Sequence, residues 1–443
     1  MLLQQPLPPP APRPLIGLRS ATLLVVANMI GAGVFAITGD LARTIPSASA
    51  LLLAWVVGGL MALCGALSYG ELAARLPRSG GEYHFLSRLY HPALGFVSGF
   101  VSLVVGFAAS IAANATAFGI YVATLVPGLD PVVAALGLLT ALSLLHAFNA
   151  RFGVAFQDVF AVLKVALILI FIVAGLFVFD PAAAGVGALR VLPTAADWDF
   201  VFNGAYALAL ISIYYAYLGW NASVYLAGEV RQSERNVPLS LMLGTLAVLV
   251  LYLLLNYVFL RSVPLETLTG KVEIGALAAE AIFGRTVGGV LSGLIAFALV
   301  SSTSSMILIG PRVTAAMGED FPVYRLFARR TSQGGPKYAL LAQWLIAGLL
   351  IATASFGQIL QYIGFTLGLF SALTVLGVYV LRHREGPPTG LRAWGYPITP
   401  ALFILLCLWM VVQSLVSNPW TSVAGLATMA LGLVVYRLSW RAA

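Results

Sequence analysis

In the middle of the first long apolar run, residues 27–35 read Ala27-Asn28-Met29-Ile30-Gly31-Ala32-Gly33-Val34-Phe35. Two glycines one residue apart favour a stretch that leaves the helical conformation, because glycine loses more backbone entropy in a helix than other residues do. The same small residues are also typical of a notch into which a neighbouring helix packs. Taken alone, the stretch allows either interpretation.

The composition of the chain indicates that lipid is its solvent. Of the 443 residues, 60% are hydrophobic and only 9% are charged, and the mean hydropathy is +0.96. Soluble chains carry about 25% charged residues. We therefore expect an all-α polytopic membrane protein, which excludes a cytosolic enzyme, a DNA-binding protein and a disulfide scaffold. The two cysteines, Cys64 and Cys407, lie in apolar stretches and are predicted to be core residues.

Twelve apolar runs are candidate membrane spans, since a helix needs about 20 apolar residues to cross a bilayer. They lie near residues 18–38, 47–74, 93–125, 132–147, 156–179, 201–227, 238–261, 285–310, 339–355, 359–382, 398–417 and 420–437. Residues 1–14 are rich in proline and predict a disordered tail. Residues 15–440 predict a single transmembrane transporter domain.

The basic residues predict which side of the membrane each loop occupies. With a cytoplasmic amino terminus, 18 of the 24 lysines and arginines fall in inner segments, five fall in outer loops, and Lys164 lies within a span. Inner loops of membrane proteins carry such an excess of basic residues. We therefore expect a multi-pass protein of the cell inner (plasma) membrane with both termini cytoplasmic. The net charge of +8 then needs no nucleic-acid partner to explain it.

A second apolar span carries an unusual block in its middle. Residues 214–221 read Tyr214-Tyr215-Ala216-Tyr217-Leu218-Gly219-Trp220-Asn221, which by itself could be an aromatic packing seam. Spans one and six are equivalent if residues 18–179 and 201–382 form a five-plus-five inverted repeat, with two further helices at 398–437. Interrupted helices at matching positions of two halves indicate a transporter's binding site. The pairing therefore favours discontinuous helices 1 and 6.

A helix broken at the membrane midplane suits a zwitterionic ligand. It exposes free N–H groups at a positive dipole end and free C=O groups at a negative end. Because unsatisfied backbone groups in hydrocarbon are costly, the break must line a cavity or meet a ligand. The carboxylate of an amino acid matches the N–H end and its ammonium group matches the C=O end. An amino acid can thus be bound without any charged side chain.

Four stretches carry motifs in a recognisable order. They are Gly-Ala-Gly-Val-Phe at 31–35, Tyr-Gly-Glu-Leu through Pro-Arg-Ser-Gly-Gly-Glu-Tyr at 69–83, Tyr-Ala-Tyr-Leu-Gly-Trp-Asn through Glu-Arg-Asn-Val-Pro at 215–238, and Pro-Arg-Val through Ala-Met-Gly-Glu-Asp at 311–320. Together they resemble the amino acid–polyamine–organocation (APC) superfamily, and most closely its L-type amino acid transporter branch. The resemblance covers roughly residues 15–440.

The resemblance implies alternating access around a central site. The substrate-binding residues it implies are Ile30, Gly31, Ala32, Gly33, Tyr214, Tyr215, Tyr217, Gly219 and Asn221. Backbone N–H groups of residues 31–33 would bind the substrate carboxylate, and Ile30 with the backbone around the tyrosines would receive the ammonium group. Tyr215 would act as a gate that closes over the substrate from outside. Many relatives carry Phe or Trp there, so the side-chain preference stays open.

Lys164 is the only basic residue deep within a span. A charge at the bilayer centre costs about 2.5–3.5 kcal/mol on insertion scales, so such a residue usually has a partner or a role. The alternative is a side chain that snorkels to the cytoplasmic headgroups. The resemblance implies that its ammonium group replaces the sodium ion of coupled relatives, bridging the broken first helix to Ser301, Ser302 and Thr303. Sodium-independent transport is therefore predicted.

The remaining polar residues allow more than one role. Glu229, at the inner end of span six, either latches the cytoplasmic side by pairing with an arginine or is a solvated helix end. Ser110 and Asn114 share a face of span three, and either line the pocket or join helices by hydrogen bonds. The charged residues after span two are interpreted as a structural gate element: Glu71, Arg75, Arg78 and Glu82.

Several classes of site are not indicated. The four histidines are scattered without metal-ligand spacing, and there is no phosphate-binding glycine loop and no nucleophile motif. No metal site, no cofactor and no enzymatic activity are expected. No acidic residue is expected near the pocket, which argues against arginine, lysine or polyamine substrates.

These observations predict a sodium-independent secondary transporter of amino acids, favouring neutral ones, that works by alternating access as a proton symporter or an exchanger. The alternative within transporters is a cationic amino acid or polyamine exchanger. From a different class, a channel or a transport-dead receptor stays open. Because no cysteine lies in an outer loop, no disulfide-linked glycoprotein subunit is expected.

Overall fold

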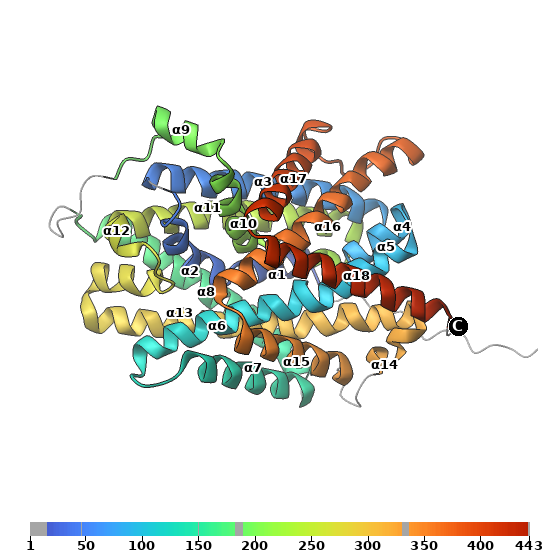
Figure 1. The fold of residues 1–443 in the computed structure, drawn as a ribbon, viewed down its shortest axis with the longest axis horizontal. Coiled ribbons are helices and arrows are strands. Elements are labelled where there is room, and N and C mark those ends of the chain that lie inside the picture. Colours follow the sequence, from blue (N-terminus) through green and yellow to red (C-terminus); the bar gives the residue numbers. More distant parts are fainter. Residues whose placement is uncertain (1–15, 46, 149, 182–188, 330–335, 442–443) are drawn as a thin grey trace, which may run out of the picture.

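The computed structural model describes residues 16–45, 47–148, 150–181, 189–329 and 336–441 (Figure 1). The predicted tail, residues 1–14, lies outside this part. The described residues form helices and connecting segments, together with one isolated β-bridge between Ile16 and Val230. The all-helical fold class is confirmed.

Every predicted span falls on a helix or on a broken pair of helices. The first half contains α1 (Leu18–Met29), α2 (Ala32–Leu41), α3 (Ala48–Arg75), α4 (Glu82–Leu89), α5 (Pro92–Val101), the π-helical η1 (Ser102–Ala109), α6 (Ser110–Leu125), α7 (Pro131–Phe148) and α8 (Ala150–Phe177). The second half contains α9 (Ala195–Val201), α10 (Gly204–Tyr217), the 3₁₀-helical η2 (Ala222–Glu229), α11 (Ser233–Ser262), α12 (Leu265–Leu268), α13 (Ile274–Asp320), η3 (Pro322–Tyr324), α14 (Arg325–Ala328), α15 (Lys337–Thr353) and α16 (Phe356–Glu385). The last two helices are α17 (Ile398–Ser417) and α18 (Pro419–Arg441).

Many of these helices are suited to a bilayer. Within the described residues, eight helices are long and apolar enough to cross a membrane, or nine if α9 and the α10–η2 segment count as one bent span. Three shorter apolar helices cover 131–147, 162–177 and 337–353. The protein is therefore a multi-pass membrane protein.

Two helices differ from the predicted ranges. The span predicted at 285–310 is part of α13, which is kinked at Gly284 and continues to Asp320. Hydropathy cannot detect that extension, because its last residues are polar although they remain helical. The short helix α4 was not among the predicted spans, since its eight residues are too few to cross a bilayer.

The broken segments lie at the centre of the bundle and the last two helices lie at its rim. In α1–α2, 83% of the most apolar 18-residue window is buried, against 28% in α17 and 22% in α18. Large aromatic side chains fill the space around the breaks, including Trp55, Trp220 and Tyr252. Polar backbone at the breaks is thus shielded from lipid by other helices.

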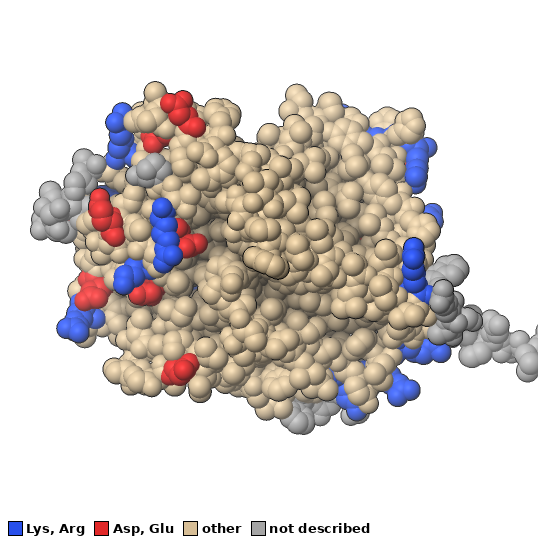
Figure 2. All heavy atoms as spheres, in the orientation of Figure 1, with Lys and Arg blue, Asp and Glu red and all other residues tan. Residues whose placement is uncertain are grey.

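Charged side chains gather at two opposite ends of the molecule. Figure 2 shows them separated by a broad band of uncharged surface, which matches a protein with a lipid-facing middle. On the face shown, the end near the C-terminus carries basic side chains, whereas the opposite end mixes acidic and basic ones.

Candidate functional site

Both predicted helix interruptions are present. The first lies between α1 and α2, where Ile30 and Gly31 have extended backbone (φ −73°, ψ 92° and φ −132°, ψ −154°). The second follows Tyr217, where Leu218 is extended (ψ 148°) and Gly219 has φ +99°. A positive φ is readily accessible only to glycine, so this turn depends on Gly219. The interpretation of these stretches as unbroken helices is therefore wrong.

The second break lies directly against the first. A Cβ added to Gly219 would lie 2.8 Å from the carbonyl carbon of Asn28 and 2.9 Å from its Cβ. The turn after α10 therefore lies against the last turn of α1, and the free backbone groups of both breaks share one region.

Two side chains satisfy backbone groups freed by the breaks. Asn114 of α6 accepts a hydrogen bond from the N–H of Ala32 at 2.8 Å, at the first turn of α2. Tyr252 of α11 donates from its hydroxyl to the carbonyl of Met29 at 2.5 Å and lies 3.3 Å from the carbonyl of Ala216. Asn114 thus joins helices by a hydrogen bond, and Tyr252 links the C-terminal ends of α1 and α10.

Lys164 of α8 binds the first break at its carbonyl end. Its Nζ donates to the carbonyls of Ala27 and Ile30, each at 3.0 Å, and to Oγ of Ser302 at 2.9 Å. The Ser302 hydroxyl in turn donates to the carbonyl of Ile30 at 2.7 Å. Lys164 is only 3% exposed, so the snorkelling interpretation is wrong. The ammonium group instead neutralises the negative end of the α1 dipole.

The rest of the hydroxyl cluster on α13 does not contact the lysine. Thr303 donates to the carbonyl of Leu299 within its own helix, and Ser304 pairs with His146 Nε2 of α7 at 2.8 Å. Ser301 is buried, and its Oγ has no hydrogen-bond partner within the described residues. Of the three predicted coupling hydroxyls, the structure brings only Ser302 to Lys164.

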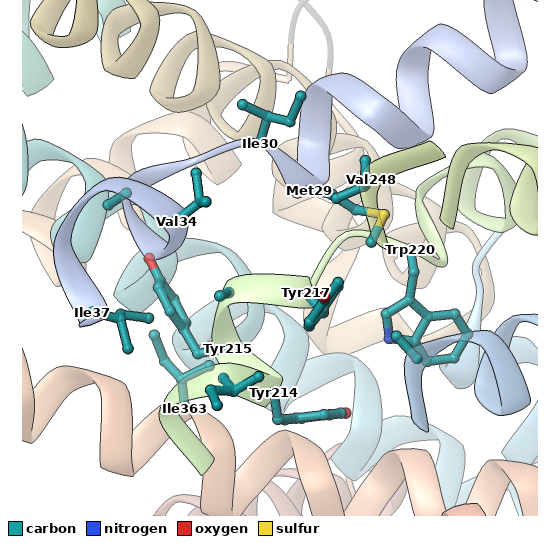
Figure 3. Close-up of a cluster of buried hydrophobic side chains, with 14 of the residues drawn as sticks. Met29, Ile30, Val34, Ile37, Tyr214, Tyr215, Tyr217, Trp220, Val248 and Ile363 are labelled. Carbon is teal, nitrogen blue, oxygen red and sulfur yellow. The ribbon is translucent and has the colours of Figure 1, made fainter. Parts of the chain in front are cut away.

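The three tyrosines of α10 point in different directions (Figure 3). Tyr214 donates to Ser371 Oγ of α16 at 2.8 Å, and Tyr217 donates to the carbonyl of Trp55 at 3.1 Å. Tyr215 is 6% exposed. All three tyrosines thus belong to the packed core of the bundle.

A cavity begins at the breaks and extends toward η2 and α4. Break residues in its lining are Asn28, Leu218, Gly219, Asn221 and Ala222. Apolar side chains and hydroxyls complete it: Val101, Phe107, Met306, Ile309, Leu367, Phe370, Ser98, Ser102, Ser110 and Ser371. Gly219 and Asn221 are the predicted substrate-binding residues in this lining; the others belong to the packed region around the breaks.

Glu82 also lines the cavity, which corrects the prediction that no acidic residue lies near the pocket. It is 6% exposed and accepts hydrogen bonds from Tyr69 at 3.0 Å, Asn221 at 2.6 Å and Tyr225 at 2.7 Å. The preceding Gly80 and Gly81 have φ +126° and +59°, which turns the chain back under the bundle. The sequence placed Glu82 in an inner loop, and only this turn brings it inside.

The segment between α3 and α4 joins several helices at one end of the bundle. Arg78 donates to both carboxylate oxygens of Asp320 at 3.0 Å, and this hydrogen bond raises the pKa of the Arg78 guanidinium. Tyr83 also donates to Asp320, and Ser79 Oγ accepts from the N–H of Gly228 at 2.9 Å. The inner end of η2 is thus joined to α13 through this segment.

Two predicted gate residues differ in their surroundings. Glu71 is buried and accepts from Arg382 at 2.5 and 2.8 Å, so it joins α3 to α16. Glu229 is exposed, and its carboxylate forms no ion pair within the described part of the chain. The solvated helix end is the better interpretation of Glu229. The sequence did not identify Asp320 as the partner of Arg78. No cluster of metal-ligating side chains occurs among the described residues.

A cavity at two adjoining helix breaks, inside an apolar bundle, is the arrangement of a membrane transporter. The chain belongs to the amino acid permease family, which it matches over residues 16–436. It is a transmembrane amino acid transporter of the APC superfamily and not an enzyme, and the resemblance seen in the sequence is confirmed.

Three relatives that are named as transporters or exchangers of amino acids align over nearly the whole chain. The b(0,+)-type amino acid transporter 1 of Mus musculus is 26% identical over 96% of this chain and 87% of its own length. The large neutral amino acids transporter small subunit 2 of Mus musculus is 26% identical over 96% and 80%. The serine/threonine exchanger SteT of Bacillus subtilis (strain 168) is 26% identical over 95% of both chains.

Proposed function

We propose that this protein is a sodium-independent carrier that moves amino acids across the inner (plasma) membrane by alternating access. The two adjoining helix breaks support this best, since they offer N–H and C=O groups to a zwitterion at the centre of the bundle. The carboxylate would bind at the first turn of α2. The ammonium group would bind near the last turn of α10, because the Ile30 carbonyl already accepts from Lys164 and Ser302.

The proposed architecture is a single domain over residues 15–440 with twelve spans. Residues 18–179 and 201–382 are the two inverted repeats in this proposal, and α17 and α18 are appended. Both termini would be cytoplasmic, which agrees with the basic end of the molecule in Figure 2. In this orientation, Glu82 and η2 lie toward the cytoplasmic side, where the Arg78–Asp320 ion pair joins the α3–α4 segment to α13.

Sodium independence is proposed from Lys164. Its ammonium group occupies a position between the broken α1 and Ser302, where it binds two carbonyls and one hydroxyl. Carbonyl and hydroxyl oxygens are also the ligands that a small cation would use. A fixed cation there would hold α1, α8 and α13 together without an added ion.

The proposed substrates are neutral amino acids. The names of two relatives support this, since one is called a large neutral amino acids transporter and another a serine/threonine exchanger. The latter name also supports exchange as the transport mode, with proton symport through Lys164 as the competing mode. Cationic amino acids are a second candidate, because the carboxylate of Glu82 lines the cavity.

The carrier is proposed to act without a disulfide-linked subunit. One relative is named a small subunit, which describes that protein as part of an assembly. The two cysteines of this chain, Cys64 and Cys407, are both buried in helices. Neither can reach a partner on the outer surface.

Counterflow in proteoliposomes tests the proposal. Vesicles loaded with unlabelled leucine, alanine or serine should accumulate the labelled amino acid transiently, and replacing sodium with choline should leave the rate unchanged. Label that equilibrates without an overshoot would indicate a channel. Binding without any flux would indicate a receptor, and loss of uptake in choline would exclude the role given to Lys164.

A further inference from the structure

The cavity contains one acidic group that the transport of neutral amino acids does not require. Glu82 contacts the cavity and is 6% exposed, yet its three hydrogen-bond donors, Tyr69, Asn221 and Tyr225, are all neutral. No ion pair to Glu82 occurs in the described part of the chain. A buried carboxylate without a cationic partner is costly, so a cation that entered the cavity would be bound there.

The bonding of the carboxylate leaves room for such a partner. An ionised carboxylate offers about four acceptor positions. Among the described residues, Oε1 accepts from Tyr69 and Asn221, whereas Oε2 accepts from Tyr225 alone. One acceptor position on Oε2 therefore has no donor from this part of the chain.

The shape of the lining indicates the kind of cation. The same cavity touches the breaks at Asn28 and Gly219 and is walled by apolar side chains such as Val101, Phe107 and Leu367. An amino acid held at the breaks would place its side chain along these walls, toward Glu82. A side chain with a flexible hydrocarbon stem and a cationic end would fit both the apolar walls and the Glu82 carboxylate.

We infer that Glu82 is a specificity-determining residue that extends the substrate range to amino acids with a cationic side chain, such as lysine and arginine. The inference rests on the proposed function, because it assumes that the amino acid head is held at the breaks. Asn221 donates to Glu82 and directly follows the second break, so it keeps the carboxylate at a fixed distance from the head-group site.

Norleucine and lysine make the test, since they share a hydrocarbon stem and differ in the terminal ammonium group. Both are used as competitors of labelled norleucine in counterflow by the full-length chain in proteoliposomes. Lysine should compete in the wild type. Glu82→Gln should lower the affinity for lysine relative to norleucine by about tenfold or more, because a charge-assisted hydrogen bond is lost. Glu82→Asp, which keeps the charge, should retain part of the preference.

Matched variants separate this role from a structural one. Glu234→Gln removes an exposed carboxylate at the start of α11 and should leave the ratio of affinities as in the wild type. Tyr225→Phe removes the donor to Oε2 while Glu82 stays charged, and should raise the affinity for lysine relative to norleucine. It also gives a readout if Glu82→Gln does not fold, since a purely structural role would lower both affinities together.

The outcomes distinguish the inference from the proposed function. Norleucine counterflow without competition by lysine overturns the inference and leaves the carrier function intact. An unchanged ratio in Glu82→Gln overturns it too, and an altered pH dependence of norleucine uptake would then make Glu82 a proton carrier. Absence of counterflow with either amino acid rejects the carrier function itself.

Discussion

Gly33 of α2 lies directly against Ala216 of α10: a Cβ on Gly33 would be 2.5 Å from the Cα of Ala216 and 2.6 Å from its Cβ. The two broken segments therefore touch backbone to backbone beside the breaks. No other residue fits without moving one helix away from the other, because the nearest atom belongs to the backbone. If the two segments move apart during transport, a substitution at their contact should alter the transport rate.

Replacement of Gly33 by alanine is expected to impair transport. The added methyl group must push α2 away from α10, and overpacking of this kind costs about 1–3 kcal/mol. We expect counterflow of leucine to fall about tenfold or more, since 1.4 kcal/mol corresponds to tenfold. Gly137→Ala is the control, because a Cβ on Gly137 meets nothing within 4 Å. Equal uptake by the two variants would show that the contact is not needed for transport.

Removal of the buried ammonium group should abolish or uncouple transport. Lys164→Ala leaves the carbonyls of Ala27 and Ile30 without their shared donor, although the protein should still fold and insert. The measurement is uptake as a function of pH in proteoliposomes. Val162→Ala, at a 52% exposed position of the same helix, is the control. Uptake and pH dependence like those of the wild type would remove the role given to Lys164.

A carboxylate introduced at residue 114 should compete with the substrate. Asn114 already accepts from the N–H of Ala32, so Asn114→Asp would place a fixed negative charge at the α2 terminus where the substrate carboxylate is proposed to bind. We expect a loss of amino acid affinity of about tenfold or more, from like-charge repulsion. Thermal-shift titration with leucine measures it. Undiminished stabilisation by leucine would place the substrate carboxylate elsewhere.

The latch between Arg78 and Asp320 should control access from the inner side. Partly exposed ion pairs contribute about 0.2–1 kcal/mol, so Arg78→Gln should raise the open population up to about fivefold. The open population can be measured in a Ser102→Cys variant, as the rate at which an impermeant maleimide labels this cavity residue. The background should be low, because Cys64 and Cys407 are buried.

The control for the latch is Arg88→Gln, which changes an exposed arginine on α4. It should leave the labelling rate at its starting value. If both arginine variants accelerate labelling equally, the effect comes from surface charge and not from the latch.

The sequence predicted the breaks well but the partners of the breaks poorly. Gly31, Gly33 and Gly219 indicate local departures from the helix. Such breaks can be predicted from the sequence, because the conformational freedom of glycine is a property of the residue itself and not of its distant neighbours. Tyr252 was missed, although a hydroxyl in the middle of an apolar span is a signal for a buried hydrogen bond. Glu82 was assigned to a loop, because hydropathy cannot show that a turn with positive φ at Gly80 and Gly81 folds the chain inward.

The sequence by itself determined that this is a membrane protein and where two of its helices are interrupted. These properties follow from composition and from short-range backbone preferences. Only the tertiary structure decided that Lys164 caps α1, that Ser302 is its hydroxyl partner and that Glu82 lines the cavity. Each of these depends on side chains more than 130 residues apart in the chain, whose meeting is decided by how whole helices pack.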